Sequence, residues 1–315
     1  MSLTKSELKV LLALDEPMTL KELAEKLNLS KPTLSVTISS LERKGLIERQ
    51  SKKPLTIKPA NNKATQLLKR IKTEYSHLNL EKLLSGNYLK TLAALKVETP
   101  QPPWLLQLKA NVSRPTLHRI LNELMEHLIV GKTKEGYFLN ERFALLKAFA
   151  EEYFWLENTL KVEEFDPSAT VVWSGVGELI LTTKKFKGKS VGEFQLTGLA
   201  RFSDFGLPLI SSGVYHYYRP AREISLEEVV VHTLRLGSDT RELLYASALL
   251  RGVSFDEKKL RKLAAKFEVS DVVDDLLEFL KGVPKHYPFP SREEVEELWR
   301  QYFGGHKYDH QRKTD

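Results

Sequence analysis

The chain has 315 residues, enough for two or three domains with sizeable cores, and it lacks an apolar run long enough to span a bilayer. It has no cysteine, which excludes disulfides and thiolate metal or redox sites. Its net charge of +7 is uneven: residues 1–150 hold 25 Lys and Arg against 14 Asp and Glu, and residues 151–315 hold 23 against 27. We expect a cytoplasmic protein without a membrane partner or a signal peptide, whose basic half suits a polyanion such as nucleic acid or forms a solvated lysine-rich surface.

One heptapeptide occurs almost twice, as NLSKPTL at residues 28–34 and as NVSRPTL at residues 111–117. The segments before it also match, because Leu8 aligns with Leu89 once a two-residue insertion is placed in the loop ETPQPPW. The repeat therefore predicts two copies of one unit, each with three short helices followed by a β-hairpin.

The first copy shows how the repeated heptapeptide can begin a helix. Thr19 can cap a second helix and Ser30 a third that runs to about residue 44, with Pro32 in its first turn. Gly45 suits the end of that helix, and residues 46–50 and 54–59 read as strands around a turn at residues 51–53.

The third helix of this copy has a polar, acid-free outer face. Leu34, Ile38 and Leu41 follow core spacing. A helix that enters a DNA major groove presents such polar side chains to base edges, and a basic hairpin beside it would hold phosphates. The predicted DNA-binding residues are Ser30, Lys31, Thr33, Ser35, Thr37, Ser39 and Arg43 on the helix, and Arg49, Lys52 and Lys53 on the hairpin.

A helix-turn-helix followed by a basic hairpin is a winged helix. The segment TLKELAEKLNLSKPTLSVTISSLERKGLIER, residues 19–49, resembles the DNA-binding core of MarR and related archaeal-type winged-helix regulators. The resemblance covers about residues 4–58 and implies a transcription regulator that binds double-stranded DNA.

The second copy keeps this plan with a different outer face. Leu117, Leu121 and Leu124 take the core positions, and Leu128 stands where the first copy has Gly45. We expect either DNA binding or packing against a partner domain from this copy. Its candidate DNA-binding residues are Arg114, Thr116, His118, Arg119 and Asn122 on the helix, and Lys132 and Lys134 on the hairpin.

The predicted domains are winged helix 1 (1–58), a connecting helix (59–85), winged helix 2 with a following helix (86–158) and an α+β effector or partner domain (159–315). Residues 141–160 carry an aromatic stripe that favours core packing, with a homodimer interface as the alternative. Short β-branched and aromatic runs at residues 169–175, 178–186, 193–199 and 213–220 predict strands. Capping boxes beginning at Ser225, Ser254 and Ser291 predict helices after them.

Two stretches of the last domain, FQLTGLARFSDFGL and ISLEEVVVHTLRL, resemble the C-terminal domain of type IV abortive-infection antitoxins, which has nucleotidyltransferase-like ancestry. An active nucleotidyltransferase needs paired acids after its Gly-Ser loop, but Ser174 and Gly175 are followed by Lys184 and Lys185. Gly188-Lys189-Ser190 is likewise an incomplete phosphate-binding loop. We expect no enzyme activity, no cofactor and no metal site.

The fold class we predict is α+β, with two tandem winged helix-turn-helix domains followed by a mixed domain whose C-terminal part is helical. The predicted function is that of a sequence-specific DNA-binding transcription regulator, with a protein partner or effector at the C-terminal domain. The alternative is a protein-interaction module, such as an antitoxin or a protein that recruits a transcription factor.

Overall fold

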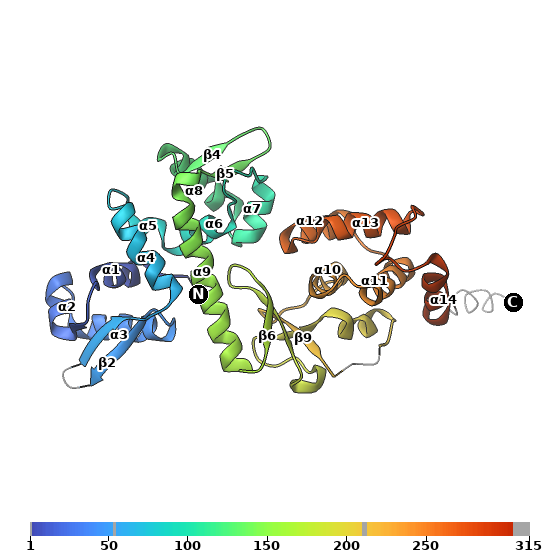
Figure 1. Cartoon of the computed structure of the whole chain (residues 1–315), viewed down its shortest axis with the longest axis horizontal. Helices are drawn as coiled ribbons and strands as arrows, with labels where there is room; N and C mark the ends of the chain where they lie inside the picture. Colours follow the sequence, from blue (N-terminus) through green and yellow to red (C-terminus); the bar gives the residue numbers. More distant parts are fainter. Residues whose placement is uncertain (1, 53–54, 210–212, 305–315) are drawn as a thin grey trace. The chain divides into compact units, whose positions relative to one another are not determined.

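The first copy of the repeat folds as three helices and a hairpin, as its capping residues predict. We describe the chain from a computed structural model that covers residues 2–52, 55–209 and 213–304. In Figure 1 this copy is the blue segment. Its elements are α1 (Lys5–Ala13), β1 (Met18–Thr19), α2 (Leu20–Leu27), α3 (Lys31–Arg43), β2 (Ile47–Lys52) and β3 (Leu55–Pro59).

Side-chain caps begin the helices of this copy. Thr19 forms a capping box with Glu22, and the Ser30 hydroxyl accepts a hydrogen bond from the backbone N–H of Thr33. Gly45 follows α3 with φ +69°, the left-handed conformation that suits glycine. One detail of the hairpin differs from prediction: β2 continues through Lys52, with a bulge after Arg49, so the turn starts later than residue 51.

The second copy repeats the order of three helices and a hairpin after a helical connection. In place of a third strand, Gln101 makes an isolated bridge to Tyr137. A long helix, α9, follows the hairpin. The elements are α4 (Lys63–Glu74) and α5 (Leu80–Leu83) in the connection, then α6 (Gly86–Ala94), α7 (Pro103–Ala110), α8 (Arg114–Glu126), β4 (Val130–Lys132), β5 (Tyr137–Leu139) and α9 (Ala144–Phe165).

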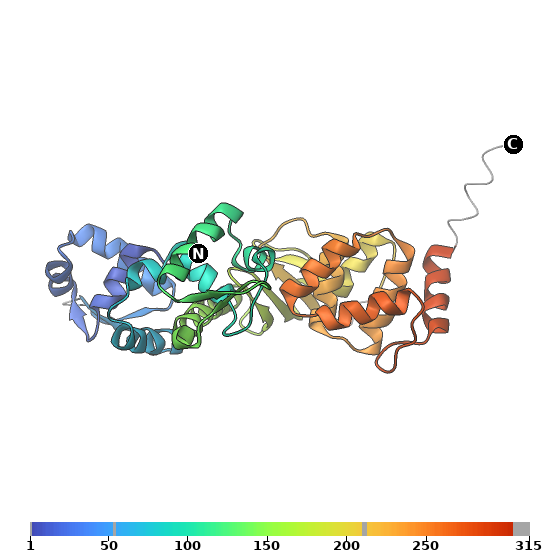
Figure 2. The ribbon, with the colours of Figure 1, turned by 90° about the horizontal axis from the view of Figure 1, so that it is seen from above.

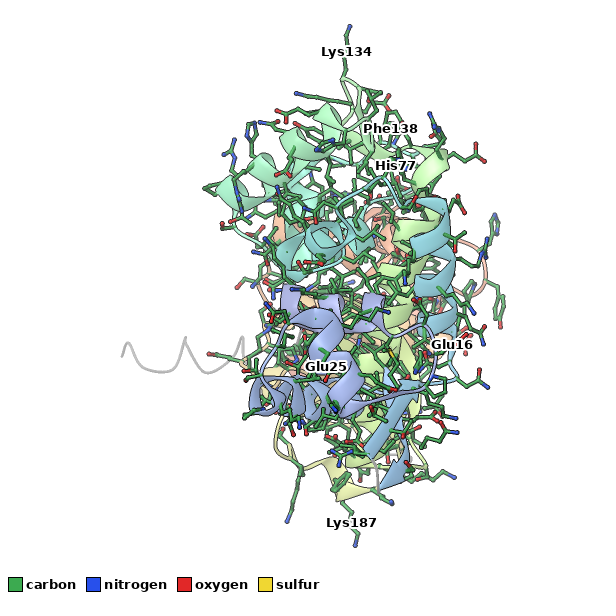
Figure 3. All side chains as sticks on the ribbon, turned by 90° about the vertical axis from the view of Figure 1, so that its left-hand side faces the viewer. Glu16, Glu25, His77, Lys134, Phe138 and Lys187 are labelled. Carbon is green, nitrogen blue, oxygen red and sulfur yellow. The ribbon has the colours of Figure 1, made fainter. Side chains whose placement is uncertain are left out.

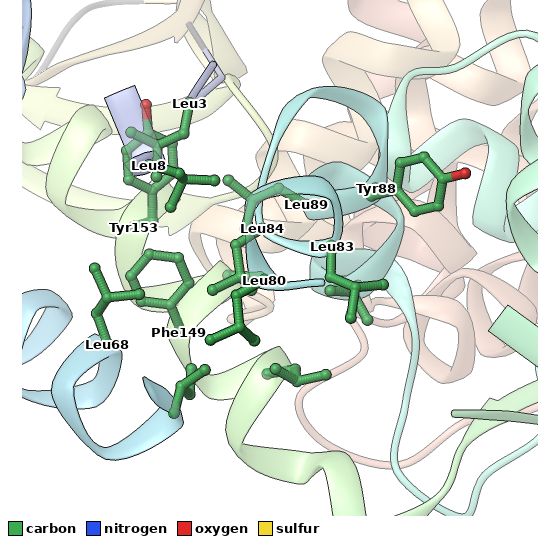
Figure 4. Close-up of a cluster of buried hydrophobic side chains, with 14 of the residues drawn as sticks. Leu3, Leu8, Leu68, Leu80, Leu83, Leu84, Tyr88, Leu89, Phe149 and Tyr153 are labelled. Carbon is green, nitrogen blue, oxygen red and sulfur yellow. The ribbon is translucent and has the colours of Figure 1, made fainter. Parts of the chain in front are cut away.

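Both copies share one hydrophobic core. Figure 4 shows Leu8 of α1, Leu80 of α5, Leu89 of α6 and Phe149 of α9 in the same buried cluster. The aromatic stripe of residues 141–160 belongs to this core within a single chain, which confirms core packing for it. The two copies are therefore parts of one packed body rather than separate modules on a linker.

The rest of the described chain forms a second unit with a four-stranded sheet and a helical part. By contacts the chain divides into residues 1–164 with 174–177, and residues 165–173 with 178–315. The sheet order is β6-β7-β9-β8. Its elements are β6 (Thr170–Ser174), β7 (Leu179–Thr183), β8 (Gln195–Thr197), β9 (Tyr215–Arg219), α10 (Leu226–Leu236), α11 (Thr240–Gly252), α12 (Glu257–Phe267), α13 (Ser270–Leu280) and α14 (Arg292–Phe303).

The two faces of this sheet pack against different groups. Successive strand residues point to opposite faces, so Tyr218 packs with the helices while Tyr217 packs with Phe165 and Phe186. In both views the orange helices lie to one side of the yellow strands (Figures 1 and 2). This arrangement makes the chain α+β, as predicted.

The predicted strands are all present, and two of the three predicted capping boxes of this unit are confirmed. Ser225 and Ser291 cap α10 and α14 with Glu228 and Glu294. The box at Ser254 is wrong, because Asp256 caps α12 instead, accepting a hydrogen bond from the N–H of Lys259. Within the described ranges, the helices are too short or too polar to cross a bilayer.

Candidate nucleic-acid interface

Helix α3 presents its outer face from a firmly capped first turn. The Thr33 N–H lies 3.3 Å from the Ser30 hydroxyl, and Pro32 occupies the first turn, where an N–H would lack a helical partner. Leu34, Ile38 and Leu41 are buried, as their spacing predicts. The opposite side of the helix is consequently turned to solvent.

The outer face of α3 is polar, small and free of acid over residues 31–40. Lys31, Thr33 and Ser35 are exposed, and Thr37 and Ser39 are half-buried. Val36, 72% exposed, lies among them and was absent from the predicted set, although its place outside the Leu34-Ile38-Leu41 stripe was a usable signal. The face combines hydroxyls, one cation and methyl groups, all of which fit base edges in a major groove.

Some hydroxyls of this face already take part in hydrogen bonds of the helix. Ser30 and Thr33 share a hydrogen bond of 2.8 Å between their hydroxyl oxygens, and the Thr37 hydroxyl donates to the Thr33 carbonyl at 3.1 Å. Ser30 therefore fixes the start of the helix. Lys31, Ser35 and Val36 are left as the side chains that point outward most freely.

A buried ion pair fixes the other end of α3 against α1. The Lys44 ammonium lies 2.7 Å from both carboxylate oxygens of Glu7, which also accepts a hydrogen bond from the Ser40 hydroxyl. Burial alone would raise the pKa of Glu7, but these hydrogen bonds and that of the Thr4 N–H outweigh it and hold the pKa below its ordinary value. The carboxylate thus stays charged and keeps α3 in place.

Two basic side chains of the first hairpin are already paired with carboxylates of the same chain. Arg49 forms an ion pair of 2.9 Å with Glu42 of α3, and Lys58 one of 3.4 Å with Glu48. Arg43, by contrast, is exposed, and its Nε donates to the Ser39 carbonyl at 3.4 Å. The side chain of Lys52 and all of Lys53 lie outside the described part of the chain.

Helix α8 of the second copy presents longer side chains at the aligned positions. Arg114, His118 and Arg119 are exposed, and Thr116 and Asn122 are half-buried. The Asn122 amide and the Nδ1 atom of His118 lie 3.2 Å apart. The structure therefore gathers the predicted helix residues of this copy on one outward face, with an Arg and an Asn that can serve as hydrogen-bond donors to bases.

A polar contact also fixes α8 against α6, but here the carboxylate lies on the third helix of the copy instead of the first. Glu123 of α8 accepts hydrogen bonds from the Tyr88 hydroxyl of α6 and from Lys82. Tyr88 aligns with Glu7, and Glu123 aligns with Ser40. Hydrogen bonds from Lys82 and Tyr88 lower the pKa of Glu123, so the acid of this pair is charged at neutral pH.

The second hairpin carries its two lysines differently. Lys134 extends away from the ribbon at the tip of the hairpin (Figure 3), and Glu135 is its neighbour in sequence. Lys132 lies over the ring of Tyr137, with 5.3 Å between the ammonium and the ring centroid. Both lysines are exposed and can reach a phosphate.

Leu128, at the end of α8, is the least expected feature of this copy. Its φ is +55°, a conformation that disfavours side chains with a Cβ, and its side chain is 73% exposed. Trp104, at the start of α7, is another large apolar side chain that stays 41% exposed. These two residues make this copy more apolar on its surface than a purely polar DNA contact requires.

The motifs weighed for catalysis have structural explanations. Ser174 and Gly175 form the end of a hairpin and accept hydrogen bonds from the Asn158 amide at 2.8 and 3.0 Å. Gly188-Lys189-Ser190 leads into strand β8, whereas a phosphate-binding loop leads into a helix. In residues 2–52, 55–209 and 213–304, no three His, Asp or Glu side chains lie close enough together to hold a metal ion.

Two histidines of the second unit differ in how deeply they are buried. His232 is fully buried, with its Nδ1 2.8 Å from the Thr197 hydroxyl, and burial lowers its pKa to about 3. His216 is half-buried, and burial lowers its pKa as well. The His232 ring packs against Tyr218 and Phe267.

Comparison with known families finds two matches. Residues 3–53 match the MarR family, and residues 191–303 match a family described as HVO_2833_C, C-terminal. The first match covers the three helices and strand β2 of the first copy and ends before β3, so this copy is similar to the winged helix of the MarR family. Comparison with curated proteins and with solved structures finds no match.

Proposed function

We propose that this protein is a sequence-specific DNA-binding transcription regulator that reads DNA with α3 and holds the backbone with the first hairpin. The observation that carries the proposal is the acid-free outer face of α3, which is exposed over its first two turns. A carboxylate there would meet phosphates or base acceptors with unfavourable charge. The MarR match over residues 3–53 supports the same assignment.

Each outward side chain of α3 has a physical role in this reading. Lys31 can donate to guanine, Ser35 can hydrogen-bond to several base edges, and the methyl groups of Val36 can pack on a thymine methyl. Lys52 and Lys53 of the hairpin would neutralise phosphates and set the position of the helix without selecting a sequence.

The second copy is, in our proposal, a second winged helix on the same DNA. Arg114 or Arg119 would recognise guanine and Asn122 adenine, with Lys132 and Lys134 on phosphates. One chain would then supply the two half-site contacts that regulators commonly obtain from two subunits. The chain acts by binding, without catalysis, and the second unit is available to an effector, a protein partner or another copy of the chain.

The test is selection of genomic DNA fragments by the full-length protein at moderate salt, followed by sequencing. The variant Val36→Glu places a carboxylate on the outer face of α3, and Val283→Glu makes the same change at an exposed valine of the second unit. We expect a recovered motif that Val36→Glu abolishes and Val283→Glu leaves intact. Fragments without a shared motif, or equal loss in both variants, would refute sequence-specific reading by α3.

A second candidate, a protein-interaction module, is favoured by one observation in the second copy. Leu128 and Trp104 are exposed, and Leu128 keeps a conformation that glycine would adopt at lower cost. In that case residues 86–139 would hold a protein, and the selected DNA would contain a single half-site. Two half-sites about one helical turn apart would favour DNA binding by both copies.

A further inference from the structure

The loop between β7 and β8 is strongly basic although it lies in the acidic half of the chain. Lysines occupy positions 184, 185, 187 and 189, and the first acid after them is Glu193. Sequence reasoning noted Lys184 and Lys185 only as replacements for catalytic acids. We call residues 184–190 the lysine loop.

The lysine loop has a defined and costly backbone conformation. Phe186, Lys187 and Gly188 have φ values of +64°, +43° and +75° in succession, and only the last is glycine. Residues with a Cβ adopt this region at a cost in free energy, so surrounding contacts must hold them there. The Lys189 N–H closes the turn with a hydrogen bond of 2.9 Å to the Phe186 carbonyl.

Aromatic stacking supplies part of that support. The ring of Phe165 stacks on Phe186 at 4.4 Å and on Phe194 at 4.0 Å between centroids. Tyr217 of β9 meets Phe165 edge-on at 5.6 Å. The loop is thus anchored through Phe186, and the segment after it through Phe194, to the sheet face that the helices leave uncovered.

A buried carboxylate holds one of the four lysines. Asp166 is fully buried, lies 2.7 Å from the Lys185 ammonium, and accepts hydrogen bonds from Thr183 and Ser168. Burial alone would raise the pKa of Asp166, but these partners lower it well below its ordinary value. Lys185 is therefore a structural cation that fixes the first residues of the loop.

The other three lysines are presented to solvent. Lys184, Lys187 and Lys189 are exposed, and within the described ranges none of them has a carboxylate at ion-pairing distance. Figure 3 shows the side chain of Lys187 extending away from the ribbon. A rigid loop that presents three unpaired ammonium groups, next to a fourth that is neutralised, lowers the ordering cost of binding an anion.

We propose that the lysine loop binds the phosphate backbone of DNA, so that the second unit contributes a contact of its own to the complex. The inference rests on the proposed function. Lysine is a flexible point charge that suits phosphodiesters and lacks the fork geometry for reading guanine, so the contact would add affinity without adding sequence preference. A lipid surface is a poorer partner, because the loop is not part of an amphipathic helix.

The experiment compares two double variants of the full-length protein, each of which removes two exposed lysines of the second unit that form no ion pair within the described residues. These are Lys187→Ala with Lys189→Ala in the loop, and Lys258→Ala with Lys262→Ala on α12 as the matched control. Affinity for a selected fragment and for a scrambled one is measured from 50 to 200 mM salt. We expect the loop variant to lower the slope of log affinity against log salt by about 2 on both fragments, and the control to keep the wild-type slope.

A third variant, Lys184→Glu with Lys189→Glu, avoids the positive-φ position at residue 187 and should weaken binding further on both fragments. Thermal unfolding of each variant checks that the second unit stays folded. A wild-type slope in both loop variants, or an equal decrease in the α12 control, would refute DNA binding by the lysine loop and leave the proposed regulator function intact. Failure of the wild-type protein to bind any fragment would overturn both.

Discussion

The two copies of the three-helix unit share a plan but satisfy it with different chemistry. The first fastens its third helix with a buried carboxylate on α1, Glu7, and the second with a carboxylate on α8, Glu123. Gly45 ends α3 and Leu128 ends α8 in the same left-handed conformation. Both copies thus hold the third helix with a buried or half-buried carboxylate and end it with a residue of positive φ. The helix that carries the carboxylate, and the type of residue that ends the third helix, differ between the copies.

The largest expected effect is on stability, and it tests whether the two copies unfold as one cooperative unit. Leu34→Ala and Leu117→Ala truncate aligned core residues that are 0% and 2% exposed. Each should cost about 2–5 kcal/mol of unfolding free energy. Because both side chains belong to one core, hydrogen exchange should show both copies opening together in either variant. Faster hydrogen exchange confined to the mutated copy would show that the two copies are independent folding units.

Removing the polar contact that holds the third helix should cost more stability in the first copy than in the second. Glu7→Gln leaves the Lys44 ammonium, whose side chain is 11% exposed, without its anion, so we expect a loss of about 3 kcal/mol of unfolding free energy at pH 7. The folded pKa of Glu7 lies below 4.5, so the ion pair contributes fully above pH 4.5 and is lost as pH falls through the folded pKa.

Denaturant unfolding between pH 7 and pH 3 measures this contribution, and the gap between wild type and Glu7→Gln should narrow with acid. Tyr88→Phe is the counterpart in the second copy. It should cost only about 1 kcal/mol, because Glu123 keeps its partner Lys82. If the stability difference between wild type and Glu7→Gln did not change with pH, the Glu7–Lys44 ion pair would not be its source.

Exchanging the helix-ending residues should shift stability in opposite directions by about 1–2 kcal/mol. Gly45→Ala is destabilising, because φ is +69° and an added Cβ would lie 3.2 Å from Leu160. Leu128→Gly removes the conformational cost and should stabilise the protein by about 1 kcal/mol.

A suitable control is Gly177→Ala, which has the same φ of +69° with no atom within 4 Å of the added Cβ. It isolates the backbone cost from the contact with Leu160, and thermal unfolding separates the three variants. A destabilised Leu128→Gly would show that the leucine side chain contributes contacts that its exposure hides.

The smallest expected effect is on the salt dependence of DNA binding, and it compares the phosphate contacts of the two hairpins. Lys52→Ala with Lys53→Ala should weaken binding to all sequences and lower the slope of log affinity against log salt by about 2. The loss of DNA affinity between 50 and 200 mM salt should then be about tenfold smaller than in the wild type. Lys132→Ala with Lys134→Ala should do the same if the second hairpin also touches phosphates. Salt titrations that change only with the first pair would assign backbone contact to the first copy alone.

Much of the fold could be predicted from local chemistry. Ser30, Pro32 and Gly45 mark the ends of α3, and the Leu34-Ile38-Leu41 spacing marks its buried side, because capping and periodicity act over a few residues. The Ser254 box failed because Asp256 offers a second capping carboxylate two residues later, and sequence cannot rank two caps so close together.

The features that sequence reasoning missed depend on contacts between distant residues. Pairing of Arg49 with Glu42 depends on how β2 packs beside α3, and no periodicity reveals it. The positive φ at Phe186 and Lys187 is equally silent in the sequence, since only Gly188 signals such a backbone. The outward position of the candidate residues on α3 could be predicted because an exposed helix face follows directly from the buried one, and Val36 was omitted because only polar residues were counted.

The placement of both copies in one polypeptide has an evolutionary consequence. In a regulator built from identical subunits, a mutation in the gene appears in both reading helices, and the operator is under pressure to stay palindromic. In the function we propose, α3 and α8 are encoded separately and can diverge independently, and the aligned pairs Ser35 with His118, Val36 with Arg119 and Ser39 with Asn122 already differ. Under that proposal, selection would tune one half of the recognised sequence at a time, and the operator would be free to lose its dyad symmetry.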